Sequence, residues 1–150
     1  MSSYPMNQFA PSYQQALMRP PAEVVGYEDR PFEYVYNPPT GALTALQIIN
    51  PDSLAIQTDA DFWLAGWYLS QYTGSFQLQL LDSTGYQLQS GMINSAAISQ
   101  VASDPTVVSP AHPFPAGSKI QIIIQDLSDA PNALQIVFKG WKRFRIQTSA

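Results

Sequence analysis

The sequence predicts an all-β protein, a single antiparallel β-sandwich of jelly-roll-like type that follows an extended, proline-rich N-terminal arm. Short segments with period-two alternation recur along the chain, and turns bearing Pro or Gly separate them. No long stretch has helical periodicity. Five of the 13 prolines lie in the first 31 residues. We therefore divide the chain into an arm, residues 1–31, and a sandwich domain, residues 32–150.

The densest apolar run lies between Asp61 and Gln89 and contains two predicted strands. In Phe62–Leu69 both faces are apolar. One face is expected to hold Phe62, Leu64, Gly66 and Tyr68, and the other Trp63, Ala65, Trp67 and Leu69. In Phe76–Leu81, apolar residues alternate with glutamines, so one face is buried. A strand that is apolar on both faces must be covered twice, which requires two packed sheets or one sheet closed on itself.

The other expected elements follow from turn and breaker residues. They are an edge strand over Phe32–Tyr36, a strand over Leu43–Ile49 ended by Asn50-Pro51-Asp52, an extended piece over Leu54–Ile56, a long loop over Ser90–Pro110 with a short helix within Asn94–Val101, a strand over Lys119–Gln125 and a last strand from Ala133 through Phe138 towards Ile146. Gly140, inside the last strand, predicts a bulge or a close backbone approach.

The arm has two interpretations. Proline at this density blocks helix propagation and central-strand pairing, which is typical of a disordered tail. Disordered segments usually carry fewer aromatic residues, which favours an arm that orders on a neighbouring subunit. Its candidate contacts are the large side chains Tyr4, Met6, Phe9, Tyr13, Leu17, Met18 and Tyr27.

Composition excludes several classes of function. The chain is 45% hydrophobic and only 12% charged, has no cysteine and carries a net charge of −4. The lack of cysteine rules out disulfides, thiolate metal sites and cysteine nucleophiles. No apolar run approaches the length of about 20 residues that spans a bilayer, and we expect no membrane association. The first 15 residues have neither a charged start nor an apolar core, so we expect no secretion signal.

Four of the seven basic residues lie close together near the C-terminus and leave the rest of the chain at −8. They are the candidate contact residues Lys139, Lys142, Arg143 and Arg145. Three interpretations stay open: a solvated or subunit-facing strand, pairing with an acidic partner protein, and single-stranded nucleic-acid binding through phosphate contacts and stacking. The acidic balance of the chain argues against the last, and we expect no nucleic-acid partner.

The residues give no sign of catalysis. His112 is the only histidine and no G-x-S-x-G nucleophile sequence accompanies it. The pairs Asp59/Asp61 and Asp126/Asp129 suit turns better than a calcium site, which needs six to eight oxygens. We therefore expect no enzyme activity, no cofactor and no metal.

Three segments resemble small virion proteins of tailed bacteriophages. They are the run from Asp61 through the turn Asp82-Ser83-Thr84-Gly85 to Leu88, the sequence Phe114-Pro115-Ala116-Gly117-Ser118-Lys119-Ile120, and the ending Val137-Phe138-Lys139-Gly140-Trp141-Lys142-Arg143-Phe144. In such proteins, similar hairpin, turn and terminal-strand patterns recur in this order. The first 31 residues match no pattern of this kind.

The resemblance implies a structural part of the particle, found in the virion after assembly in the host cytoplasm. It would be a collar or neck protein at the head-to-tail junction, a capsid decoration protein or a minor tail piece. Its partners would be portal, capsid or tail proteins and further copies of itself, and no catalytic residue is implied. The alternative is a carbohydrate- or receptor-binding sandwich module of a tail, suggested by Trp63, Trp67, Tyr68 and Tyr72, since exposed aromatic rings stack on sugars.

Overall fold

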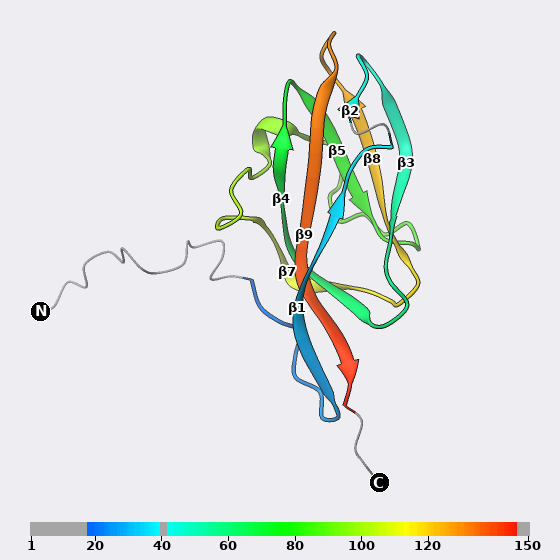
Figure 1. Ribbon diagram of the computed structural model, residues 1–150, viewed down its shortest axis with the longest axis vertical. Helices are drawn as coiled ribbons and strands as arrows, with labels where there is room; N and C mark the ends of the chain where they lie inside the picture. The colour runs from blue at the N-terminus through cyan, green and yellow to red at the C-terminus, as the bar shows by residue number, and fades with distance from the viewer. Residues whose placement is uncertain (1–17, 40–41, 147–150) are drawn as a thin grey trace, which may run out of the picture.

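The computed structural model describes residues 18–39 and 42–146, and over these residues the protein is all-β. Two antiparallel sheets lie in a sandwich-like arrangement (Figure 1). The strands are β1 (Tyr27–Tyr36), β2 (Ala42–Leu43), β3 (Ile48–Ala55), β4 (Asp61–Tyr72), β5 (Phe76–Leu81), β6 (Ile93–Asn94), β7 (Thr106–Phe114), β8 (Lys119–Asp126) and β9 (Asn132–Arg145), and η1 (Ser95–Ala97) is a 3-10 helix. One sheet has the order β1-β9-β4-β7, with β2 also paired to β9, and the other has the order β3-β8-β5-β6.

One hydrophobic core draws on both sheets. The predicted alternation of the regular strands is confirmed, because their apolar residues have almost no exposed surface. These residues are Phe76, Leu78 and Leu80 of β5, Ile120, Ile122 and Ile124 of β8, and Leu134, Ile136 and Phe138 of β9. Each strand presents one apolar face to the other sheet, as the period of two requires.

The predicted faces of β4 are wrong beyond Leu64. The ladder of β4 with β9 shifts register between Leu64 and Gly66, which is a β-bulge at Ala65. The extra residue rotates the rest of the strand, so Trp67 follows Leu64 into the core, while Tyr68 is only half-buried. Strict alternation could not show this, because both faces of the segment are apolar.

Two further stretches differ from the expected elements, and in both a strand continues through a proline that was expected to break it. The strand predicted over Leu43–Ile49 is instead the short β2 and the start of β3, which continues through Pro51. The expected loop over Ser90–Pro110 contains β6, η1 and the start of β7, and the expected helix is reduced to η1. β1, β3 and β7 each end a sheet. A proline on such an edge strand can direct its missing N–H towards solvent, so it removes no ladder hydrogen bond.

The boundary placed after Pro31 falls within a strand. β1 begins at Tyr27, and Pro31 pairs with Trp141 of β9. Phe32–Tyr36 lies in an edge strand as expected, but that strand starts five residues earlier. The last described part of the predicted arm, residues 27–31, is therefore part of the first sheet.

Candidate subunit interface

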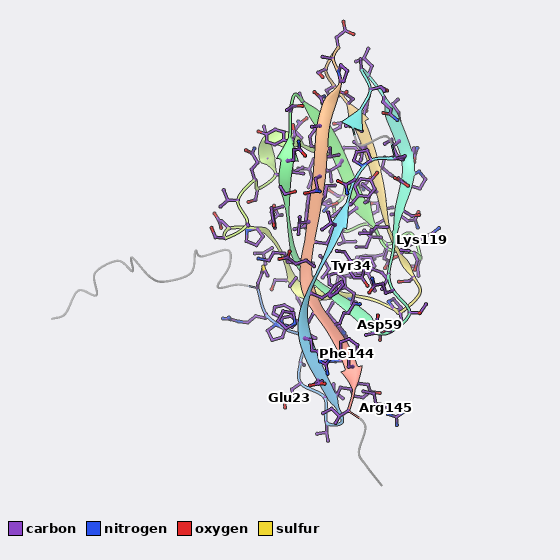
Figure 2. The ribbon with its side chains drawn as sticks, viewed as in Figure 1. Glu23, Tyr34, Asp59, Lys119, Phe144 and Arg145 are labelled. Carbon is purple, nitrogen blue, oxygen red and sulfur yellow. The ribbon has the colours of Figure 1, made fainter. Side chains whose placement is uncertain are left out.

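β1 and β9 continue beyond the other strands as a two-stranded ribbon (Figure 1). β4 begins at Asp61, which pairs with Arg143, whereas β1 follows β9 to the pair Tyr27 and Arg145. Figure 2 shows Phe144 and Arg145 on this ribbon, below the body of the protein. The ribbon thus places the start of β1 beside the end of β9, away from the core.

The end of the ribbon is apolar and open. A turn forms where Tyr27 N donates to the Val24 carbonyl at 3.1 Å, with Gly26 at a φ of 88°. Ile146 N donates to the Gly26 carbonyl at 2.8 Å and joins the C-terminal strand to this turn. Val24, Val25, Tyr27 and Ile146 are exposed to 43, 98, 41 and 47%. We call these four residues the apolar tip.

Lys142, a predicted subunit contact, is buried inside its own chain, with 3% exposure. Its Nζ donates to the two carboxylate oxygens of Asp59 at 3.0 and 3.1 Å, and lies 3.9 Å from the centre of the Phe32 ring. Figure 2 shows Tyr34 and Asp59 near the base of the ribbon. The lysine therefore stabilises the junction of ribbon and body.

Arg143 is also satisfied within the chain. Its Nε donates to Asp29 Oδ1 at 2.8 Å, and its Nη2 donates to the Ala22 carbonyl at 2.6 Å. The hydrogen bonds that Arg143 donates to the Asp29 carboxylate are the main reason that the pKa of Arg143 is raised; burial opposes this shift, and the nearby negative charges add to it. The guanidinium lies 5.2 Å from the Trp63 ring. Arg143 thus joins the N-terminal segment, β1 and β4.

The other two basic candidates differ from each other. Lys139 is half-buried, and its Nζ lies 3.4 Å from the Ala102 carbonyl and 3.9 Å from the Glu33 carboxylate. Arg145 is exposed on the ribbon, next to the apolar tip. Of the four, Arg145 alone is well placed to meet a partner.

The described part of the N-terminal segment lies on its own subunit. Met18 contacts the sheet at Gly66, where an added Cβ would lie 2.8 Å from the Met18 Sδ. Pro20-Pro21 lines two hollows, one with Trp63 and one with Trp141. The remaining predicted arm contacts, Tyr4, Met6, Phe9, Tyr13 and Leu17, lie outside the described residues.

His112 links the two sheets at one side of the sandwich. Its Nε2 lies 3.1 Å from Asp82 Oδ2, its ring stacks on Tyr86 with centroids 5.3 Å apart, and it meets Phe114 edge-on. Burial raises the pKa of Asp82, but hydrogen bonds from Thr84, Tyr86 and His112 outweigh it and hold that pKa below its ordinary value. The pair fastens the turn after β5 to β7.

A groove lies beside this pair, between β7 and the segment that follows the turn. It has a volume of about 470 Å³, and Trp67, Tyr86, Leu88 and Ile93 line it together with β7 residues 106–113. We call it the edge groove. Its walls combine aromatic, aliphatic and proline side chains with the polar residues Gln89, Thr106, Ser109 and His112.

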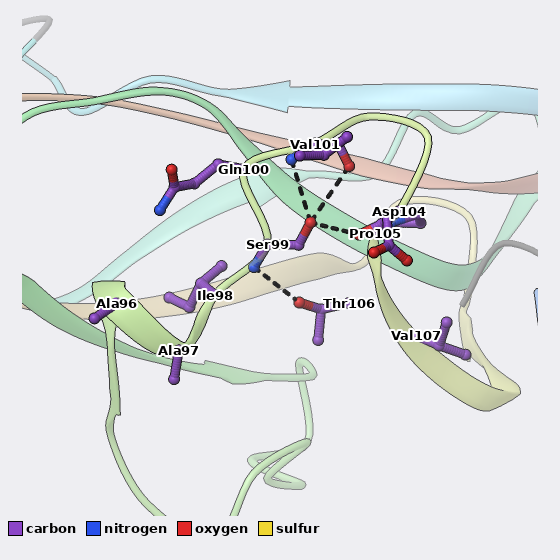
Figure 3. Close-up of a pocket in the computed structure, with 10 residues that line it drawn as sticks. All are labelled: Ala96, Ala97, Ile98, Ser99, Gln100, Val101, Asp104, Pro105, Thr106 and Val107. Atoms are coloured by element: carbon purple, nitrogen blue, oxygen red, sulfur yellow. Dashed lines mark hydrogen bonds between the residues drawn. The ribbon is translucent and has the colours of Figure 1, made fainter. Parts of the chain in front are cut away.

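A second hollow, of about 570 Å³, lies along the loop between η1 and β7 (Figure 3). Ser99 organises this loop: its N–H donates to Thr106 Oγ1 at 3.4 Å, and its Oγ accepts from Val101 N at 3.2 Å. The lining combines small and aliphatic side chains with the polar residues Ser99, Gln100, Asp104 and Thr106.

The acidic pairs lie at strand ends and in the adjoining turns. Asp61 Oδ1 accepts a backbone N–H of the turn before β8 at 2.8 Å, and Asp59 accepts from the buried lysine. Asp126 is 1% exposed and accepts from Asn132 Nδ2 at 2.7 Å, whereas Asp129 is exposed. Within residues 18–39 and 42–146, no three His, Asp or Glu side chains are grouped so that they could hold a metal ion.

The aromatic residues considered for sugar stacking are mostly engaged. Trp67 is 1% exposed in the core, and Arg143 covers part of the Trp63 ring. Tyr72 is half-buried, and its hydroxyl accepts from Gln100 Nε2 at 2.6 Å. These rings do not form an open platform.

The chain matches no family model, and it matches no curated protein and no solved structure. The part of the chain that the structure describes contains no helix with the length and hydrophobicity needed to cross a bilayer.

Sequence reasoning missed two features of these surfaces. Val24-Val25-Gly26 could have been recognised as a glycine turn with exposed valines, but it was included in the proline-rich arm. Asp82 and His112 are 30 residues apart in the sequence, and no local sequence pattern predicts their contact.

Proposed function

We propose that this protein is a non-enzymatic structural component of a tailed-phage virion. It assembles through subunit contacts, at the head-to-tail junction as a collar or neck protein or on the capsid as a decoration protein. The observation that carries the proposal is the apolar tip, four large apolar side chains held open at the end of a projecting ribbon.

A jelly-roll-like sandwich is the finer fold that we propose. Its support is the strand order: with β2 left aside, β1, β9, β4 and β7 form one sheet and β3, β8, β5 and β6 the other. Each sheet thus mixes early and late strands, as two Greek keys wound together produce. Such sandwiches are common building blocks of viral shells, in keeping with the resemblance of three segments to virion proteins.

The tip suits contact with another protein. Burial of one fully exposed valine side chain contributes about 1.5 kcal/mol of favourable free energy. The apolar tip offers four apolar side chains close together. The turn before β1 is hydrogen-bonded to Ile146 after β9, which holds these side chains in place, so little entropy is lost on binding. The exposed Arg145 next to them adds a charge that orients the contact.

We further propose that the predicted N-terminal arm adds a second contact through residues 1–17, since residues 27–31 belong to β1. Its described end is fixed to its own sheet by Arg143 and the Trp63 ring, and residues 1–17 precede this anchor. The partners are copies of the same chain together with portal, capsid or tail proteins, in a virion assembled in the host cytoplasm.

The experiment compares wild type with Val25→Asp and the matched control Val101→Asp, a second exposed valine on the loop after η1. Light scattering should show an oligomer for wild type and the control, and a monomer for Val25→Asp. Mass spectrometry of purified particles should detect the protein. A wild-type protein that is monomeric at high concentration and absent from particles would refute the proposal.

A further inference from the structure

Two charged side chains flank the apolar tip on opposite sides of the ribbon. Figure 2 shows Glu23 beside β1 and Arg145 beside β9. Glu23 lines a hollow together with the tip residues Tyr27 and Ile146, and Arg145 is the register partner of Tyr27. Both charged residues are exposed, and within the described part of the chain neither forms a hydrogen bond or an ion pair. The tip thus has an unpaired negative charge on one flank and an unpaired positive charge on the other.

The neighbouring charges of the ribbon are already paired within the chain. Arg143 Nε lies 2.8 Å from the Asp29 carboxylate, and the Arg30 guanidinium contacts the Glu28 carboxylate. Among the described charges at this end of the ribbon, Glu23 and Arg145 are therefore left to meet the charges of a partner.

This arrangement is complementary to itself. A two-fold axis through the tip, perpendicular to the broad side of the ribbon, brings a second ribbon to the first end to end and reverses its flanks. The β1 flank of each copy then lies opposite the β9 flank of the other, so Glu23 of each copy faces Arg145 of the other copy. Such a contact repeats every favourable pair, because both copies use the same surface.

We propose that the apolar tip binds the apolar tip of a second copy of this chain in a two-fold contact, with Glu23 and Arg145 paired across it. The inference rests on the proposed assembly through subunit contacts and names the partner of the tip. The order of the charges selects a second copy. A surface that is basic throughout would repel Arg145, and an acidic surface would repel Glu23, whereas a second copy presents both charges in the required order.

The strength of this contact is set by its size. Four apolar side chains on each copy make an interface smaller than the standard one, which buries about 800 Å² on each partner. The apolar side chains supply most of the affinity because they leave water, while the exposed ion pairs mainly fix the orientation. A weak, oriented contact suits subunits that assemble through several contacts.

The first test traps the contact as a disulfide. The chain has no cysteine, so a single introduced thiol reports only on its own contacts. Val25 is 98% exposed, and the two-fold contact brings the two copies of this residue together near the axis. Under mild oxidation by air, full-length Val25→Cys should form a linked dimer about tenfold faster or more than Val101→Cys, the exposed valine on the loop after η1.

The second test reverses the charges in the Val25→Cys background. Arg145→Glu and Glu23→Arg each turn two attractive pairs into two repulsive ones, so each alone should slow disulfide formation by about tenfold. An equal mixture of these two variants should restore the rate, because the introduced charges then face opposite charges. Lys119→Glu, on the body of the protein (Figure 2), makes the same change in net charge as Arg145→Glu and should leave the rate unchanged. Circular dichroism verifies that every variant is folded.

Two results would overturn the inference: equal rates for Val25→Cys and Val101→Cys, or charge reversals that fail to rescue each other in the mixture. Either would mean that the tip binds a different surface or binds in a different orientation. Neither would refute the proposed function, because loss of the oligomer in Val25→Asp and detection of the protein in purified particles test that function separately.

Discussion

The Lys142 ammonium group lies 3.9 Å from the centre of the Phe32 ring, and Lys142 pairs with Phe62 at the start of β4, where the ribbon leaves the body of the sandwich. The lysine comes from β9 and the ring from β1, and the carboxylate of Asp59 precedes β4. A single buried cation therefore ties three chain segments together. The hydrocarbon part of the Lys142 side chain packs in the protein interior, and its ammonium group is paired with the Asp59 carboxylate.

We expect Lys142→Ala to lower the free energy of unfolding by about 1–3 kcal/mol, since it removes a desolvated cation–π contact and the packing of the stem. Urea denaturation measures the change. Lys139→Ala is the control, because that side chain is more exposed and its pairing with Glu33 is loose at 3.9 Å; it should change stability by less than about 1 kcal/mol. Equal losses for the two lysines would contradict the role given to Lys142.

Gly140→Ala should prevent correct pairing of β4 and β9. An added Cβ would lie 1.9 Å from the Trp63 carbonyl oxygen, a backbone atom that cannot move without shifting β4. We expect a loss of about 3 kcal/mol or more, or failure to fold. Gly91→Ala is matched to it, because no atom lies within 4 Å of the added Cβ there, and its midpoint in a urea titration should hardly move.

The Asp82 carboxylate makes stability depend on pH. The pKa of Asp82 is lower in the folded protein than its ordinary value, so its contribution is complete above about pH 5 and is lost as the pH falls through about pH 4 and below. The stability difference between wild type and Asp82→Asn, from urea unfolding at several pH values, should therefore shrink between pH 5 and pH 3. Asp129→Asn, at an exposed turn residue, is the reference. A difference that stays constant over this range would exclude Asp82 as the titrating group.

Asn132→Ala should destabilise the turn between β8 and β9. The Asn132 amide donates to Asp126 at 2.7 Å and to Ser128 Oγ at 2.7 Å, and the Asp126 carboxylate is buried. Loss of the amide leaves that carboxylate short of a donor, at a cost of about 2–4 kcal/mol in the free energy of unfolding. Thermal unfolding followed by circular dichroism would reveal it. Gln121→Ala, which loses one hydrogen bond to the Asp82 carbonyl, should cost less.

The sequence by itself determined the fold class and the regular strands. β5, β8 and the first half of β9 alternate strictly, and their inward faces are those that the pattern predicts. In a strand with a period of two, once one face is polar the other face must be the buried one. The turns Asp82–Gly85 and Phe114–Ser118 also stand between strands, where glycine and aspartate favour them. Gly140 marks a close approach of two backbones, one of the two possibilities that its place in a strand suggested.

Only the tertiary structure decided which face of β4 is buried beyond Leu64, because a bulge rotates a strand that is apolar on both sides. It also decided that β7 is a strand despite its prolines, since an edge strand needs only one side of its backbone to pair. The basic cluster shows the same limit. Lys142 and Arg145 look alike in sequence, but one is buried by aromatic rings from β1 and the other is exposed, and such long-range pairing leaves no local trace.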